Sequence, residues 1–206
     1  DEDLRLSLND SISMNLGGAY TTTTLEFSDQ YNKDSVTLLD GSFSDDEQGR
    51  VIQSLGRIRK KANIRNYARV VTQNTFPKGA GAAASASGFA ALTVAAFAAA
   101  GVTLSEKELT IFARQGSGSA CRSIPDGFVE WLDGDSNETS YAVSIFQPDY
   151  FGIADVVTVV SADKKFLATS EGQRSARTSP FFETRLSMIK NKIERVKKAI
   201  EEKNFS

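Results

Sequence analysis

The sequence is organised around one stretch of small residues, Asn74-Thr75-Phe76-Pro77-Lys78-Gly79-Ala80-Gly81-Ala82-Ala83-Ala84-Ser85-Ala86-Ser87-Gly88. Its proline and its two spaced glycines predict a loop that turns sharply and lets another group approach the backbone closely. The alanine-rich run that follows, to Ala100, favours a helix. A loop that opens directly into a helix points free N–H groups and the positive end of the helix dipole at one place, which suits a phosphate.

Side chains of this stretch can complete a phosphate site. Lys78 would contribute its charge and Ser85 and Ser87 their hydroxyls, while Gly79 and Gly81 would let the backbone come close. The stretch lacks the Gly-Lys-Ser/Thr ending of a P-loop, and it lacks a dinucleotide-binding fingerprint. From the spacing alone, a Gly/Ala hinge in front of a buried helix therefore remains an alternative.

The same stretch resembles the phosphate-binding motif of the mevalonate diphosphate decarboxylases, a branch of the GHMP kinase superfamily. Further stretches fit this family in its order and bring the resemblance to nearly the whole chain. They are Leu8-Asn9-Asp10-Ser11-Ile12-Ser13-Met14 with Tyr20-Thr21-Thr22-Thr23-Thr24, Arg114-Gln115-Gly116-Ser117-Gly118-Ser119-Ala120-Cys121-Arg122-Ser123, and Val160-Ser161 with Lys164-Lys165. The resemblance implies an α+β fold. It places a GHMP-kinase-like N-terminal domain, with a ribosomal-S5-domain-2-like mixed sheet packed with helices, at 1–178, and the first helix of a C-terminal domain at 179–206.

The resemblance also implies an activity. The family uses ATP to phosphorylate the 3-hydroxyl of mevalonate 5-diphosphate, and loss of phosphate and CO2 then gives isopentenyl diphosphate. ATP and Mg²⁺ are the implied cofactors, a small phosphorylated mevalonate is the implied partner, and a homodimer is the implied assembly. The expected catalytic residues are Arg122, which would bind the substrate carboxylate, and Ser85, which would lie near Mg²⁺. A planar guanidinium is the best bidentate partner for a carboxylate, so the chemistry of Arg122 agrees with this role.

Binding roles for other residues follow from the resemblance. Ser117 and Ser119 are expected to hydrogen-bond the terminal phosphates of the substrate. Arg59 and Thr169 are expected to meet phosphate groups, and Asn9 is expected to face the substrate. The ATP phosphates are assigned to Lys78, Gly79, Gly81, Ser85 and Ser87.

Some positions depart from the family pattern and keep other functions open. Ala84 replaces a serine of the family, Thr169 replaces another, and Gln173 replaces a methionine. An ATP-independent decarboxylase of mevalonate 3,5-bisphosphate, or a decarboxylase of the 5-phosphate, is therefore an alternative. The chain also has no match to the first strand of the family or to its catalytic aspartate, so a non-catalytic binding module is a third hypothesis.

Composition narrows the function classes further. The 206 residues carry a net charge of −2, one cysteine and no histidine. A nucleic-acid binder would need a basic surplus that this chain lacks. Without histidine, Ser-His-Asp catalysis is excluded, and a single cysteine leaves no zinc site. The lone cysteine fits a reducing, cytoplasmic location. The uncharged run Gly79–Leu104 consists mainly of Ala, Gly and Ser, which favours a buried helix over a membrane span.

Periodicity and capping signals predict the order of the elements. A strand meander is expected at Ser11–Met14, Tyr20–Phe27 and Val36–Leu39, with a turn at Gly17-Gly18. A helix over Glu47–Ala62 should bury Val51, Leu55 and Ile58. A second helix should begin at a Ser105/Glu108 capping box, and a third at Ser179-Pro180. Further strands are expected at Tyr67–Gln73, Gly127–Trp131, Tyr141–Phe146 and Asp155–Val160.

Two local environments are predicted as well. The serine- and glycine-rich segment Gly116–Ser123 is expected to be a positioned loop rather than a linker, because an arginine and an apolar strand follow it. Cys121 within it is expected to be a small packed thiol. The third helix should carry a core-facing apolar stripe, formed by Phe182, Leu186, Ile189, Ile193, Val196 and Ile200.

Overall fold

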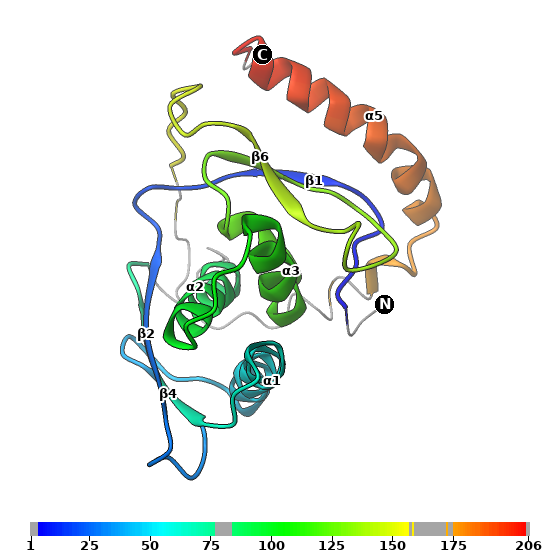
Figure 1. Cartoon of the computed structure of the whole chain (residues 1–206). Coiled ribbons are helices and arrows are strands. Elements are labelled where there is room, and N and C mark those ends of the chain that lie inside the picture. Colours follow the sequence, from blue (N-terminus) through cyan, green and yellow to red (C-terminus); the bar gives the residue numbers. More distant parts are fainter. Residues whose placement is uncertain (1–3, 77–83, 157, 159–171, 173–174, 205–206) are drawn as a thin grey trace.

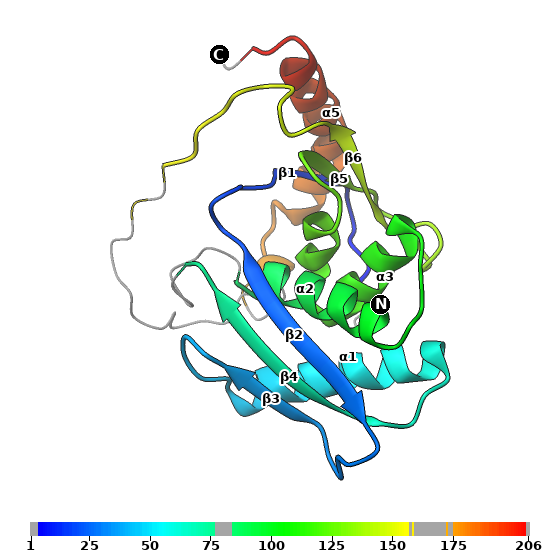
Figure 2. The same ribbon diagram turned by 60° about the vertical axis from the view of Figure 1, so that its left-hand side comes forward.

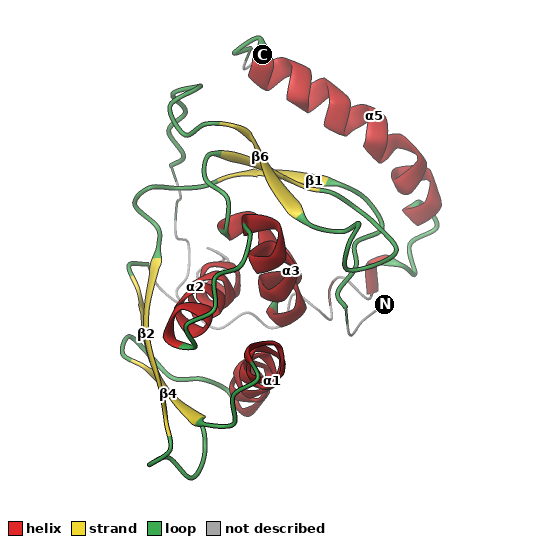
Figure 3. Ribbon diagram, in the orientation of Figure 1, coloured by secondary structure: helices red, strands yellow, loops and turns green. Residues whose placement is uncertain are grey.

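The computed structural model describes residues 4–76, 84–156, 158, 172 and 175–204. Two three-stranded sheets lie on either side of helices α2 and α3, and α5 lies outside the second sheet (Figures 1 and 2). Figure 3 shows that helices and strands both make up the fold, which confirms the predicted α+β class. The helices are α1 (Asp45–Ala62), α2 (Ala84–Ala99), α3 (Glu106–Gly116), the 3₁₀ helix η1 (Gly118–Ser123) and α5 (Phe182–Glu201). The strands are β1 (Ser11–Met14), β2 (Thr21–Ser28), β3 (Ser35–Leu38), β4 (Tyr67–Asn74), β5 (Phe128–Trp131) and β6 (Ala142–Phe146).

Local signals set the starts of α1 and α3. At the start of α1 the Ser44 hydroxyl accepts from the Glu47 N–H at 3.3 Å, and the Glu47 carboxylate accepts from the Ser44 N–H at 2.8 Å. The helix thus begins two residues earlier than predicted. Ser105 and Glu108 form the same reciprocal pair at the start of α3, as the sequence predicted. Each box satisfies N–H groups that the first helical turn leaves without an intrahelical acceptor.

The predicted meander is wrong, although each of its strands exists. β2 pairs antiparallel with β4, and β3 pairs parallel with β4, so β4 separates β2 from β3. Parallel neighbours need a crossover connection, and α1 supplies it between β3 and β4. β1 belongs to the other sheet, in the order β1-β5-β6. The predicted turn at Gly17-Gly18 is present, but it links strands of different sheets.

The main core lies between the β2-β4-β3 sheet and the helices. The predicted inner face of α1 is confirmed, because Val51, Leu55 and Ile58 are all buried. The alanine-rich helix α2 is central to this core, where its small residues let neighbours approach closely. The core cluster is completed by Ala68, Val70, Phe89, Leu92, Ala96, Phe97, Ala113 and Ala120.

Helix α5 differs from its prediction in two ways. It begins at Phe182 with Phe181 at the N-cap position, and Pro180 lies in the preceding turn. The Ser179 hydroxyl accepts from the Phe181 N–H in that turn instead of capping the helix. None of the stripe residues is fully buried. A groove of about 450 Å³, lined in part by Met14, Phe128 and Ile200, lies between this helix and the second sheet.

The predicted strand at Asp155–Val160 is wrong for the positions that the structure describes. Asp155, Val156 and Thr158 belong to no strand, and Val156 is 87% exposed. A β-branched run has high strand propensity, but that propensity is realised only where another strand pairs with the run. No helix in the described ranges combines the length and the apolar character needed to cross a membrane.

Candidate active site

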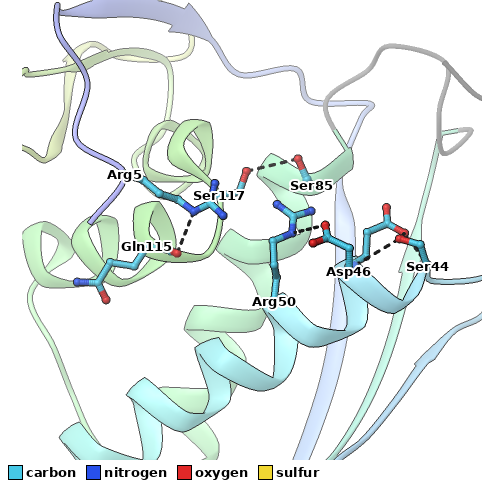
Figure 4. A network of polar contacts seen from close by, with 8 residues as sticks. Arg5, Ser44, Asp46, Arg50, Ser85, Gln115 and Ser117 are labelled. Carbon is cyan, nitrogen blue, oxygen red and sulfur yellow. Dashed lines mark hydrogen bonds and ion pairs between the residues drawn. The ribbon is translucent and has the colours of Figure 1, made fainter. Parts of the chain in front are cut away.

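Two motifs that lie far apart in the sequence meet at a pair of serines. The Oγ atoms of Ser85 and Ser117 are 3.4 Å apart (Figure 4). Ser85 is exposed in the first turn of α2, and Ser117 lies between α3 and η1 with only 7% of its surface exposed. The small-residue stretch and the Gly116–Ser123 segment, which were both predicted to bind phosphate groups, therefore come together in the fold. The segment is ordered as the 3₁₀ helix η1, so it is positioned rather than a linker.

Gly116 lets these two motifs come together. A Cβ atom at Gly116 would lie 2.2 Å from Cδ1 of Phe89, which is one helical turn beyond Ser85 on α2. Two carbon atoms that are not bonded to each other cannot come this close, so only glycine allows α3 to approach α2 to this distance. The contact between Ser85 and Ser117 thus depends on Gly116, which directly precedes Ser117 in the chain.

Arg50 brings a positive charge to the serine pair and was not predicted. Its guanidinium carbon is 5.4 Å from the centroid of the Phe89 ring, and Figure 4 shows it directed towards Ser85. Its described ionic partner is Asp46, which is 86% exposed and 3.5 Å away. The sequence periodicity of α1 could have identified Arg50. It lies four residues before the buried Ser54, and therefore on the inner side of the helix.

Ser87 is held by the first sheet. Hydrogen bonds join the Thr21 hydroxyl to Ser87 Oγ at 2.7 Å and to Asn74 Oδ1 at 2.8 Å. Ser87 therefore fixes the start of α2 against β2 and β4, next to Ser85. The other predicted ATP-binding residues of this loop, Lys78, Gly79 and Gly81, lie outside the described residues.

Arg122 lies in η1 and reaches across to the second sheet. Its Nε donates to Ser13 Oγ at 3.0 Å and its Nη1 donates to Ser11 Oγ at 2.6 Å. Its guanidinium carbon is 5.7 Å from the centroid of the Trp131 ring. Within the described ranges no carboxylate pairs with it, since its hydrogen-bond partners are the two hydroxyls. Burial lowers the pKa of Arg122, but guanidinium groups keep their charge in proteins.

Cys121 is confirmed as a packed thiol. It is fully buried, and its Sγ lies 3.1 Å from the Gly118 carbonyl oxygen. Burial raises the pKa of Cys121 to about 12, against a smaller opposing effect from Arg122 and Arg114. A thiol held in its protonated form is a poor nucleophile.

The remaining predicted residues lie in different surroundings. Arg59 is already engaged by the buried carboxylate of Asp34, through bonds of 2.7 and 2.9 Å. It lies nine residues beyond Arg50 on α1, roughly 13 Å along the axis, so the structure does not bring it to the serine pair. Asn9 donates to the Asp10 carbonyl and accepts from Arg185 of α5 at 3.4 Å. Ser119 is half-buried in η1, and Thr169 lies outside the described residues.

The site fits a phosphate better than it fits a bare metal ion. Across the described residues no three or more acidic, cysteine or histidine side chains gather closely enough to hold a metal ion. Phosphate oxygens accept hydrogen bonds from several donors that lie here. These donors are the hydroxyls of Ser85 and Ser117, the guanidinium of Arg50 and the N–H groups at the nearby start of α2. Magnesium is usually bound together with the phosphates of its ligand.

Family models match both parts of the chain. A diphosphomevalonate decarboxylase-like N-terminal domain matches residues 1–142, and a mevalonate 5-diphosphate decarboxylase C-terminal domain matches residues 155–206. A diphosphomevalonate decarboxylase from Candida albicans is 35% identical over 223 residues, which cover 100% of this chain and 61% of the relative. The predicted domain boundary at 178/179 stays a prediction.

Solved structures agree with these matches. Mevalonate diphosphate decarboxylase from Staphylococcus aureus has a TM-score of 0.89 and 36% identity, covering 100% of this chain and 62% of that one. A structure of MDDEF in complex with MVAPP, AMPPCP and magnesium has a TM-score of 0.87 and 34% identity, covering 100% of this chain and 63% of that one. The GHMP-like fold implied by the motifs is thereby confirmed. The chain spans less than two thirds of the length of these relatives.

Proposed function

Since the chain belongs to the diphosphomevalonate decarboxylase family, we propose that it forms part of an enzyme that decarboxylates mevalonate 5-diphosphate in an ATP-dependent reaction. The products would be isopentenyl diphosphate, phosphate and CO2. Two of the relatives named above are called diphosphomevalonate decarboxylase and mevalonate diphosphate decarboxylase, and a third is a complex with MVAPP, AMPPCP and magnesium. A homodimer and a cytoplasmic location stay predictions.

The observation that best supports this function is the environment of Arg122. The described hydrogen-bond partners of this half-buried guanidinium are two uncharged hydroxyls, and the Trp131 ring lies beside it, so its charge is available to an anion. Partial removal from water strengthens its attraction to a carboxylate. We assign Arg122 to the substrate carboxylate, which it would grip in the orientation needed for loss of CO2.

Phosphate groups fit the serine pair and Arg50. Ser85 and Ser117 come from two chain segments and present hydroxyls to one place, where Arg50 adds a positive charge. We assign the substrate diphosphate to the Ser117 side, and the ATP phosphates to Ser85 and the start of α2, where Ser85 would also reach Mg²⁺. When bound, ATP supplies the phosphoryl group that makes the 3-oxygen a good leaving group, and Mg²⁺ neutralises phosphate charge.

The contribution of this chain to the reaction is then positioning and charge neutralisation. As phosphate leaves, positive charge builds up on the tertiary carbon of the substrate, and the electrons of the carbon–carboxylate bond fill that centre. Arg122 keeps the carboxylate aligned with the leaving group until CO2 departs. A bond that is held in the reactive geometry reacts faster because orientation has already been fixed on binding.

The test uses the product of the complete reading frame that encodes this chain. It is incubated with mevalonate 5-diphosphate, with and without ATP and Mg²⁺, and ADP and CO2 are measured separately. We expect both products in equal amounts, only when ATP is present. Arg122→Ala should lower CO2 formation by at least about 100-fold without changing the melting temperature by more than a few degrees.

Other outcomes identify the alternatives. Release of CO2 without ATP from mevalonate 3,5-bisphosphate would replace the proposal by the bisphosphate decarboxylase. ADP without CO2 would indicate a kinase. Binding of mevalonate 5-diphosphate with neither product would indicate a binding module. Unchanged turnover by Arg122→Ala would remove the carboxylate assignment.

A further inference from the structure

Residues from two neighbouring strands hold the guanidinium of Arg122 in place. Ser11 and Ser13 of β1 and Trp131 of β5 form this site, which is called the seat below. Ser11 and Ser13 lie two residues apart on β1, so their side chains share one face of the strand. β1 pairs antiparallel with β5, and the register places Ser11 opposite Trp131. The two hydroxyls accept from Arg122 at 2.6 and 3.0 Å, and the Trp131 ring lies 5.7 Å from the guanidinium carbon.

The aromatic part of the seat is itself fixed. The Trp131 indole N–H donates to the hydroxyl of Ser140 at 3.0 Å, and Ser140 is fully buried. Trp131 is 9% exposed, so its ring has little room to turn. Two strand-borne hydroxyls and a locked ring therefore define the position of a long side chain that has several rotatable bonds of its own.

The chemistry of the acceptors distinguishes this seat from an ion pair. Arg59, by contrast, forms an ion pair with the carboxylate of Asp34. Hydroxyl oxygens accept hydrogen bonds but carry no net charge. Of the five N–H groups of the guanidinium, two are used by the seat, and among the described residues the other three and the whole positive charge are left for an anion.

We propose that Ser11 and Ser13 are positioning residues, which hold the Arg122 guanidinium in place for the substrate carboxylate while leaving its charge unneutralised. This inference rests on the proposed function, because that function assigns the carboxylate to Arg122. The reaction then requires that the groups holding Arg122 are uncharged as well as correctly placed. A carboxylate at position 13 would hold Arg122 more firmly and would still impair the reaction.

The experiment compares three substitutions at Ser13 in the full-length enzyme. Ser13→Ala should lower kcat/KM for mevalonate 5-diphosphate by about 10- to 100-fold, the loss typical of a hydrogen bond to a charged group. Ser13→Thr keeps the hydroxyl and should stay within about threefold of the wild type. Ser13→Asp should lose more than Ser13→Ala, because its charge competes with the substrate carboxylate. Ser11→Ala should repeat the Ser13→Ala result at the second acceptor.

A spectroscopic readout reports on the seat without any turnover. The Arg122 Nε–H is followed by nitrogen-edited NMR in the absence of substrate and assigned by its loss in Arg122→Lys. Its hydrogen exchange should be about tenfold faster in Ser13→Ala, and it should remain slow in Ser13→Thr and Ser13→Asp. Ser144→Ala, which removes a hydroxyl from β6 of the same sheet, is the control and should change neither readout.

These measurements separate the inference from the proposed function. A wild-type enzyme with a protected Arg122 Nε–H but no turnover would refute the proposed function and leave the seat established. Unchanged Nε–H exchange in Ser13→Ala would overturn the seat itself. Wild-type kcat/KM in Ser13→Asp would overturn the requirement for a neutral acceptor.

Discussion

Replacing Gly116 with alanine tests how closely α3 must approach α2 below the serine pair. The new Cβ would lie 2.2 Å from Cδ1 of Phe89 and 2.9 Å from Cε1 and Cγ of the same ring. Carbon atoms in ordinary contact are about 3.5–4.0 Å apart. The ring would therefore have to move by more than about 1 Å. Phe89 is only 6% exposed and belongs to the main core, so its ring can move only by displacing the residues packed around it.

The magnitude follows from two opposing effects. Overpacking a core of this kind costs about 1–3 kcal/mol. Alanine at the last residue of α3 would return at most about 1 kcal/mol through helix propensity. We therefore expect the free energy of unfolding to fall by about 1–2 kcal/mol, which corresponds to a melting temperature lower by about 2–8 °C. Because the helices move apart, binding of phosphate-bearing ligands at Ser85 and Ser117 should weaken as well.

Urea unfolding followed by circular dichroism measures the change in stability. Gly56→Ala is the matched control, because Gly56 lies inside α1 and a methyl group added there would have no atom within 4 Å. The same substitution there should raise the free energy of unfolding by up to about 1 kcal/mol. If Gly116→Ala proves as stable as Gly56→Ala, the close packing of α3 on Phe89 is refuted.

Three further predictions address charge and titration. Burial raises the pKa of Cys121 to about 12, so the folded protein keeps the thiol protonated at pH values where the unfolded chain loses the proton. The free energy of unfolding should therefore fall between pH 9 and 12, by up to about 1.4 kcal/mol per pH unit. Cys121→Ala should lack this part of the slope in urea titrations, and equal slopes would contradict the assignment. Asp34→Asn should lower the free energy of unfolding by about 3 kcal/mol, because it leaves Arg59 without its buried partner. The exposed Asp46→Asn should change it by less than about 0.5 kcal/mol, and similar losses in the two variants would speak against a buried pair. Arg50→Ala should lower kcat/KM in the ADP-release assay by at least about tenfold, with Arg65→Ala, at an exposed position, as the unchanged control. Full activity of Arg50→Ala would remove Arg50 from the phosphate site.

The sequence predicted the start of α3 and the inner face of α1, where the decisive interactions are local. The predicted capping box of Ser105 and Glu108 joins residues three apart, and α3 begins where it predicts, while α1 begins two residues before its predicted start. The inner face of α1 follows from a period of 3.6 residues, which Leu55 and Ile58 obey. The motif order identified the family and, with it, the α+β fold.

Strand order and the partners of the arginines were decided only by the tertiary structure. A period of two shows which face of a strand is buried, but it does not name the neighbouring strand, so β4 could not be placed between β2 and β3 from the sequence. Four arginines that the sequence alone does not distinguish have different partners in the structure. Arg59 pairs with a buried carboxylate, Arg122 with two hydroxyls, Arg114 with an asparagine, and Arg50 with a phenylalanine ring and the exposed carboxylate of Asp46. These partners come from segments up to 111 residues away, and their identity determines whether a guanidinium is neutralised or keeps its charge for a ligand.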